Sequence, residues 1–364
     1  MPQPRTSALP RPFHFLLFLG AGLWIVAASG LAERATQGLS VRFNLSIVSN
    51  LLQQLFFLFL LLIGFAVLHW IASRNSAPRN SASDDDLTRL NGIRSSNALP
   101  ARATTREEFL RGAALGWSLL LATVLPLMLF GTLHPEFNLS LANLGYAILS
   151  LFTLAVATLA LEVAFRGFLF IQLIEATGPV FATLFLSFLY ATLSAFRPDA
   201  TALSILDTFL FAVLFCTAYL RTRALWIGWG IHFAWSAVAA IVFGLPIPID
   251  FGFNNLIFTS VTGPEWLTGG TYGPEAAFFT AIVLLAGIFF LYRITRHYAW
   301  EYTYTPPVAS GYPMDIAPPA AHTAMENEAA AAPAPLVQIL GSTPTAASTN
   351  PVIEQHLNRN DDNP

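Results

Sequence analysis

Long apolar segments alternate with short polar ones along most of this chain. A helix needs about 20 apolar residues to cross the hydrocarbon core of a membrane. The sequence offers eight segments that approach this length, at 13–31, 47–72, 109–131, 143–174, 180–196, 201–220, 224–243 and 276–292. The pattern predicts an all-α polytopic membrane protein with about eight transmembrane helices.

The composition supports this fold class. Charged residues make up 11% of the 364 residues and the mean hydropathy is +0.58, whereas soluble globular domains contain roughly 25% charged residues. The single cysteine, Cys216, lies in an apolar segment, so the sequence offers neither a disulfide nor a thiolate metal site.

The arginines are distributed unequally between the two sides of the predicted bundle. The chain has arginines and no lysine. If successive segments cross the membrane in opposite directions, most of the arginines lie on the side that carries both termini. Because cytoplasmic loops are rich in Lys and Arg, we expect both termini and the polar loop 73–108 in the cytoplasm. The first segment exceeds the usual 7–15 apolar residues of a signal peptide, so we interpret it as an uncleaved anchor.

These boundaries divide the chain into three regions. We predict N-terminal membrane helices and a cytoplasmic loop over 1–142, a membrane domain over 143–299 and a disordered tail rich in Ala and Pro over 300–364. The connection 263–277 is rich in glycine, which permits turn conformations. We interpret it as a structural turn, with Pro274 and Glu275 in the first turn of the last helix.

Two ionisable residues lie in the fourth apolar segment. Glu162 and Arg166 are four residues apart, so on a helix they share a face and can pair. A charge at the bilayer centre costs roughly 2.5–3.5 kcal/mol on insertion scales, and such residues are therefore functional candidates. A buried ion pair that only orients one helix against its neighbours remains an alternative.

Two further residues are candidates within apolar segments. His232 lies among tryptophans in the seventh segment and is expected at a depth similar to that of Glu162 and Arg166, although a packing role remains open. Asp207 is the other carboxylate within a predicted crossing, and we expect neighbouring helices to satisfy its polar atoms. Only Glu162 and His232 are plausible metal ligands, fewer than the three that zinc sites usually take, so no metal is expected.

The motifs around these residues resemble those of the CPBP family of intramembrane proteases, the CAAX-protease and bacteriocin-processing (Abi) group. Phe165, Arg166 and Gly167 match the end of the first family motif, in which two adjacent glutamates precede the arginine. This register places Leu161 at the first glutamate and Glu162 at the second.

The second and third family motifs are also incomplete. Ser187 and Tyr190 fit the second motif, but Ser194 stands where the family has histidine. His232 matches the third motif, with Ser236 in place of asparagine or aspartate.

The resemblance implies a CPBP-type helical core, intramembrane hydrolysis of peptide bonds and a bacterial inner (plasma) membrane. It also implies membrane lipid and a membrane-embedded or lipidated peptide or protein as partners; neither a cofactor nor nucleic acid is expected. In this chain, Leu161, Ser194 and Ser236 replace the glutamate, the histidine and the asparagine or aspartate of the family motifs. Because general-base catalysis needs a proton acceptor beside the water, we expect impaired hydrolysis and a binding or chaperone-like role. The alternative is an active endopeptidase that uses Glu162 and His232, with Arg166, in an altered site.

Overall fold

The structure is a computed structural model, and it describes residues 9–76, 94, 97–100, 102–130, 133–247 and 256–296. The helices are α1 (Arg11–Phe43), α2 (Ser49–Ser76), α4 (Thr105–Leu129), α5 (Leu141–Arg166), α6 (Phe168–Thr177), α7 (Pro179–Ser194), α8 (Ala202–Thr222), α9 (Trp226–Ala237), α10 (Glu265–Thr268) and α11 (Phe278–Ile294). Short turns are η1 (Ser46–Val48), the π-helical η2 (Val238–Val242), η3 (Gly270–Tyr272) and η4 (Pro274–Ala276); the strands are β1 (Leu133–Phe137) and β2 (Ile257–Val261).

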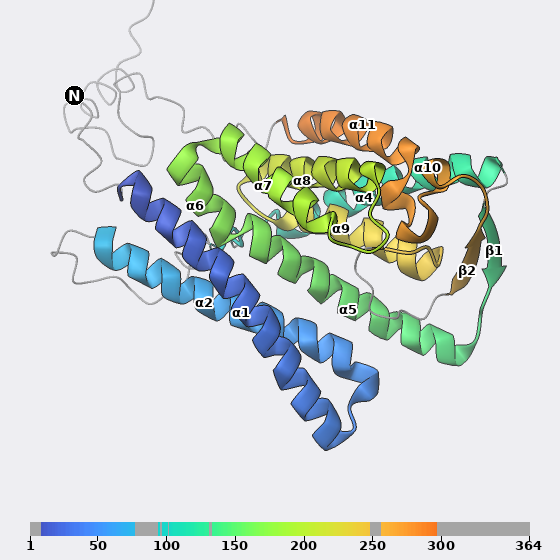
Figure 1. Cartoon of the computed structure of the whole chain (residues 1–364), viewed down its shortest axis with the longest axis horizontal. Coiled ribbons are helices and arrows are strands. Elements are labelled where there is room, and N and C mark those ends of the chain that lie inside the picture. Colours follow the sequence, from blue (N-terminus) through green and yellow to red (C-terminus); the bar gives the residue numbers. More distant parts are fainter. Residues whose placement is uncertain are drawn as a thin grey trace, which may run out of the picture. The chain divides into compact units, whose positions relative to one another are not determined.

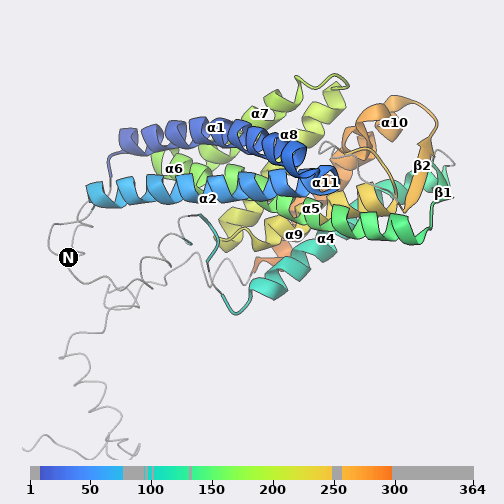
Figure 2. The same cartoon turned by 90° about the horizontal axis from the view of Figure 1, so that it is seen from below.

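The apolar helices correspond to the eight segments that the sequence predicts. Within the described ranges, five are long and apolar enough to cross a membrane, and three are shorter, at 179–194, 226–242 and 278–294. The chain is therefore a polytopic membrane protein, as predicted, and its described part is almost entirely helical. In Figures 1 and 2, α1 and α2 run side by side, and the β1–β2 ribbon lies with α10 at one end of the bundle.

Several boundaries differ from the sequence prediction. α1 continues to Phe43, well beyond its apolar segment, and α2 continues to Ser76, so the predicted loop 73–108 begins later; α4 begins at Thr105. The fourth segment forms two helices that are separated at Gly167. Most of the 73–108 loop and the whole predicted tail 300–364 lie outside the described residues.

The connections between helices meet in pairs. β1 and β2 form an antiparallel ribbon in which Leu133 lies opposite Val261. Elsewhere, Arg102 Nη1 donates a hydrogen bond of 2.8 Å to the Thr222 carbonyl. When successive predicted crossings run in opposite directions, the two segments of each pair lie on the same side of the membrane. The cytoplasmic assignment of those sides stays a prediction.

Close backbone packing fixes α9 against α4. A Cβ added at Gly112 would collide with the carbonyl oxygen of Ile227, and one at Gly116 would collide with that of Ile231. Small residues four apart allow membrane helices to approach closely. This contact sets the position of His232, which follows Ile231 on α9.

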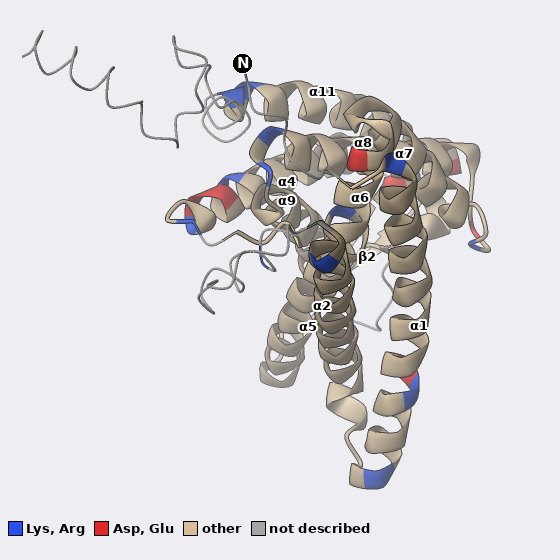
Figure 3. Ribbon diagram, turned by 90° about the vertical axis from the view of Figure 1, so that its left-hand side faces the viewer, with Lys and Arg blue, Asp and Glu red and all other residues tan. Residues whose placement is uncertain are grey.

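Charged residues are sparse along the helices and occur mainly near their ends, as the colouring of the ribbon in Figure 3 shows. Glu162 and Arg166 lie in the last turns of α5 and are buried inside the bundle. Because the surrounding side chains are apolar, these charges depend on one another and on the polar groups beside them.

Candidate active site

The sequence places Glu162 and Arg166 in the last turns of α5, just before the chain bends. Gly167 ends the helix, and a Cβ at this position would collide with the Val163 carbonyl oxygen. The glycine of the first motif therefore has a steric role. It lets the chain turn from α5 into α6 directly after Arg166.

Glu162 contacts both of the other candidate residues. Arg166 Nη1 lies 3.5 Å from Glu162 Oε1, and the side chain of each residue is 1% exposed. The same Oε1 lies 2.8 Å from Nδ1 of His232. The predicted pairing of Glu162 with Arg166 is confirmed, and the structure brings all three residues together from α5 and α9.

Glycine also allows α9 to approach Glu162. An added Cβ at Gly228, one helical turn before His232, would lie 3.3 Å from Glu162 Oε2, a distance that leaves little room for a side chain. The small residue thus lets the imidazole reach across from one helix to the carboxylate of the other.

The contact with Glu162 defines the orientation and the tautomer of His232. An ionised carboxylate only accepts hydrogen bonds, so in a neutral imidazole with this contact Nδ1 is the donor to Oε1 and Nε2 carries the lone pair. The ring also stacks on Phe215, with centroids 5.0 Å apart and planes inclined by 26°, and His232 lines a cavity. This arrangement leaves Nε2 as the basic nitrogen of the ring.

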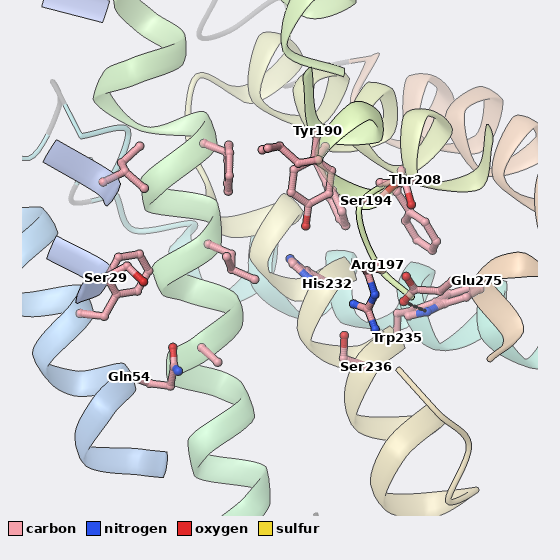
Figure 4. Close-up of a pocket in the computed structure, with 18 of the residues that line it drawn as sticks. Ser29, Gln54, Tyr190, Ser194, Arg197, Thr208, His232, Trp235, Ser236 and Glu275 are labelled. Carbon is pink, nitrogen blue, oxygen red and sulfur yellow. Dashed lines mark hydrogen bonds between the residues drawn. The ribbon is translucent and has the colours of Figure 1, made fainter. Parts of the chain in front are cut away.

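The cavity has a volume of about 670 Å³ and extends from α1 and α2 to η4. Much of its wall is apolar, including Ile25, Phe57 and Phe211. Figure 4 shows the polar side chains around it. They include Tyr190, Ser194, Arg197, Ser236 and Glu275, which line the cavity together with His232.

The positions where the motifs depart from the family pattern converge on this cavity. Leu161, Ser194 and Ser236 all line it together with His232, which supports the register chosen from the sequence. Leu161 brings an aliphatic side chain to the wall, and the Ser194 hydroxyl donates a hydrogen bond of 2.7 Å to the Ala191 carbonyl within its own helix. Neither residue supplies a strong base.

Two charged residues of the cavity, Glu275 and Arg197, were not predicted from the sequence. Glu275 is not in the first turn of the last helix, because Pro274–Ala276 form the separate turn η4 and α11 begins at Phe278. Its Oε1 accepts a hydrogen bond of 3.0 Å from Trp235 Nε1. Arg197, which falls between the predicted segments 180–196 and 201–220, also lines the cavity, and its guanidinium lies 4.9 Å from the centre of the Tyr272 ring.

The environment of Glu275 shifts its titration. Burial raises the pKa of Glu275 to about 7, while the hydrogen bond from Trp235 and the positive charge of Arg197 oppose that rise.

The expectation for Asp207 is wrong. Asp207 is fully buried on α8, but among the described residues neither carboxylate oxygen has a hydrogen-bond partner. Asp207 is also absent from the cavity lining. The carboxylate that faces the cavity is Glu275 instead.

The donor set does not resemble a metal centre. In the part of the chain that the structure describes, no group of three or more His, Cys, Asp or Glu side chains is arranged to hold a metal ion, and a zinc site usually takes three protein ligands.

A comparison with known families identifies the region that contains this site. Residues 143–238 match the family described as type II CAAX prenyl endopeptidase Rce1-like. No curated protein and no solved structure matches the chain. The matched region runs from α5 to the start of η2 and contains Glu162, Arg166 and His232, but it ends before Glu275. Residues 143–238 thus match the Rce1-like family model, in agreement with the resemblance of the motifs to the CPBP group.

Proposed function

We propose that this protein is an integral membrane endopeptidase in which His232, oriented by Glu162, activates water. The observation that carries the proposal is the 2.8 Å contact between His232 Nδ1 and Glu162 Oε1 beside the cavity. A histidine held by a buried carboxylate presents its other nitrogen as a general base in a fixed direction. The family of residues 143–238 supports the same reaction class.

In the proposed reaction, Nε2 of His232 accepts a proton from water as the water oxygen bonds to the scissile carbonyl carbon. The imidazolium that forms lies against Glu162, which stabilises its charge. Arg166 lies 3.5 Å from the same carboxylate oxygen and balances its negative charge in apolar surroundings. Ser236 follows His232 by one helical turn and lines the cavity, so we assign its hydroxyl to the developing oxyanion.

The cavity wall suggests how a substrate would enter. α1 and α2 contribute apolar side chains to the wall, including Ile25, Val26 and Phe57, and Figure 4 shows Ser29 and Gln54 of these helices on the side opposite Glu275. Such a wall suits an acyl, prenyl or aliphatic group that arrives from the membrane. We therefore propose a lipidated or membrane-embedded peptide or protein as the substrate, in a bacterial plasma membrane with both termini cytoplasmic.

A second candidate function is binding without hydrolysis. Leu161, Ser194 and Ser236 line the cavity itself, so the departures from the family pattern lie where the substrate would sit. A protein with this cavity and no effective base would hold a membrane segment or a lipidated peptide, as a chaperone does.

Cleavage of internally quenched peptides separates the two candidates. The purified protein in lipid nanodiscs would receive one peptide with a farnesylated cysteine and another with an apolar membrane segment. We expect cleavage by the native protein and a rate roughly 10²–10⁴-fold lower for His232→Ala. The matched control is His134→Ala, because His134 is exposed on β1, and its rate should equal the native rate. Binding without cleavage by the native protein would favour the second candidate.

A further inference from the structure

Glu275 is the only carboxylate among the described residues that line the cavity. It comes from η4, outside the predicted crossings and outside the segment 143–238 that matches the family. The cavity therefore contains an acid that replaces nothing in the recognised motifs, although Leu161 occupies the position of a motif glutamate.

The backbone before Glu275 is built for this placement. Gly273 has φ of 97°, which is unfavourable for residues with a side chain, and a Cβ there would also collide with the Pro246 carbonyl oxygen. The turn therefore packs directly against the chain that follows η2 and directs Glu275 towards α9. There, Trp235 Nε1 donates its hydrogen to Oε1.

This hydrogen bond joins Glu275 to the part of α9 that carries His232. Trp235 follows His232 by three residues, which corresponds to a rise of about 4.5 Å, and both side chains line the cavity. Figure 4 shows His232 and Glu275 on the same side of the cavity, with Trp235 below Glu275. A bound peptide bond can thus have the attacking water at His232 and its nitrogen towards Glu275.

We propose that Glu275 is the general acid that protonates the leaving amine, an inference that rests on the proposed endopeptidase function. After His232 has taken a proton from water, the oxyanion re-forms the carbonyl group and the bond between carbon and nitrogen breaks. The nitrogen takes the proton from Oε2 of Glu275 and leaves as an amine. Glu275 becomes a carboxylate, the other product is a carboxylic acid, and transfer of the proton from the His232 imidazolium to Glu275 through water restores both groups.

The surroundings of Glu275 suit both of its protonation states. Burial favours the neutral acid, so its pKa of about 7 leaves a large protonated fraction at neutral pH. Trp235 and Arg197 stabilise the carboxylate that forms when the proton leaves. Among the described residues, Tyr190 of α7, Asp207 of α8 and Tyr272 of η3 also interact electrostatically with Glu275.

Two substrates with different leaving groups test this role. One is a peptide with an ordinary amide bond, and the other has the same acyl part in a p-nitrophenyl ester, whose leaving group needs no proton. For Glu275→Gln we expect amide cleavage to fall at least about 100-fold relative to ester cleavage. His232→Ala should lose both activities. Glu265→Gln is the matched control, because Glu265 is an exposed acid of the same connection, and it should retain both.

The native protein supplies a second readout that does not depend on the folding of a variant. Its amide cleavage should decline as the pH rises through about 7, and its ester cleavage should not. Equal losses of both activities in Glu275→Gln, or none, would overturn the role of Glu275 and leave the endopeptidase intact. Absence of both activities from the native protein would instead refute the proposed function, and the role of Glu275 with it.

Discussion

The contact between Glu162 and Arg166 gives a quantitative prediction about stability. Glu162→Gln removes the negative charge but keeps an oxygen that can accept the hydrogen bond from His232. Arg166 then remains as a buried cation, with its side chain 1% exposed. We expect this single change to destabilise the protein strongly and the second change Arg166→Met to recover much of the loss.

The magnitude follows from the distance. For charges 3.5 Å apart, Coulomb's law with an effective dielectric constant of about 20 gives roughly 5 kcal/mol. Breaking a buried pair by removing one partner costs about 3–5 kcal/mol, whereas replacing both partners with neutral groups can cost almost nothing. Arg166→Met alone should cost less than Glu162→Gln alone, because Glu162 keeps its contact with His232.

Unfolding by SDS in mixed micelles, followed by tryptophan fluorescence, would measure the free energies of unfolding of the native protein, the two single variants and the double variant. A coupling energy of about 2–3 kcal/mol is expected. Glu107 and Arg111 provide the control, since they form an exposed ion pair with the same spacing on α4, where about 0.3–0.5 kcal/mol is usual. Additive losses at Glu162 and Arg166 would refute the reasoning.

Three further predictions concern packing, pH and catalysis. Gly116→Ala should separate α9 from α4 and lower the melting temperature in detergent, whereas Gly30→Ala should not, because a Cβ at Gly30 meets no atom within 4 Å. The pKa of Glu275 is raised from 4.5 to about 7 in the folded protein, so the native state holds this proton more tightly than the unfolded state. The free energy of unfolding should therefore fall by about 3 kcal/mol as the pH rises from about 4.5 to 7. SDS titrations at a series of pH values should show this fall for the native protein and not for Glu275→Gln. Cleavage of the quenched peptides should increase, rather than stay constant, when the motif groups are restored together by Leu161→Glu, Ser194→His and Ser236→Asn.

The sequence predicts the helices well because a membrane imposes a simple requirement on length and polarity. It also predicts the pair Glu162 and Arg166, since both residues lie on one helix and their spacing alone brings them to one face. The contact between Glu162 and His232 joins residues 70 positions apart. Depth in the membrane suggested that contact, but only the packing of α9 against α4 and α5 establishes it.

The sequence could not locate Glu275 because its environment is produced entirely by tertiary structure. Proline and glycine around it are typical of a turn, and that interpretation of the local backbone was partly correct. The turn, however, folds back against the end of η2 and carries the acid into the cavity. Asp207 shows the converse, since its position within an apolar helix suggested a satisfied polar group, whereas the structure gives its oxygens no hydrogen bond among the described residues.

Isotope incorporation during cleavage tests the central claim, that His232 activates water for hydrolysis, most directly. The native protein in nanodiscs would be incubated with a lipidated peptide in water enriched in ¹⁸O, and the products analysed by mass spectrometry. We predict a single internal cleavage, one ¹⁸O atom in the new carboxylate of the N-terminal product, and loss of this product in His232→Ala but not in His134→Ala. An intact peptide with the native protein, or labelled product at the native rate with His232→Ala, would contradict the account.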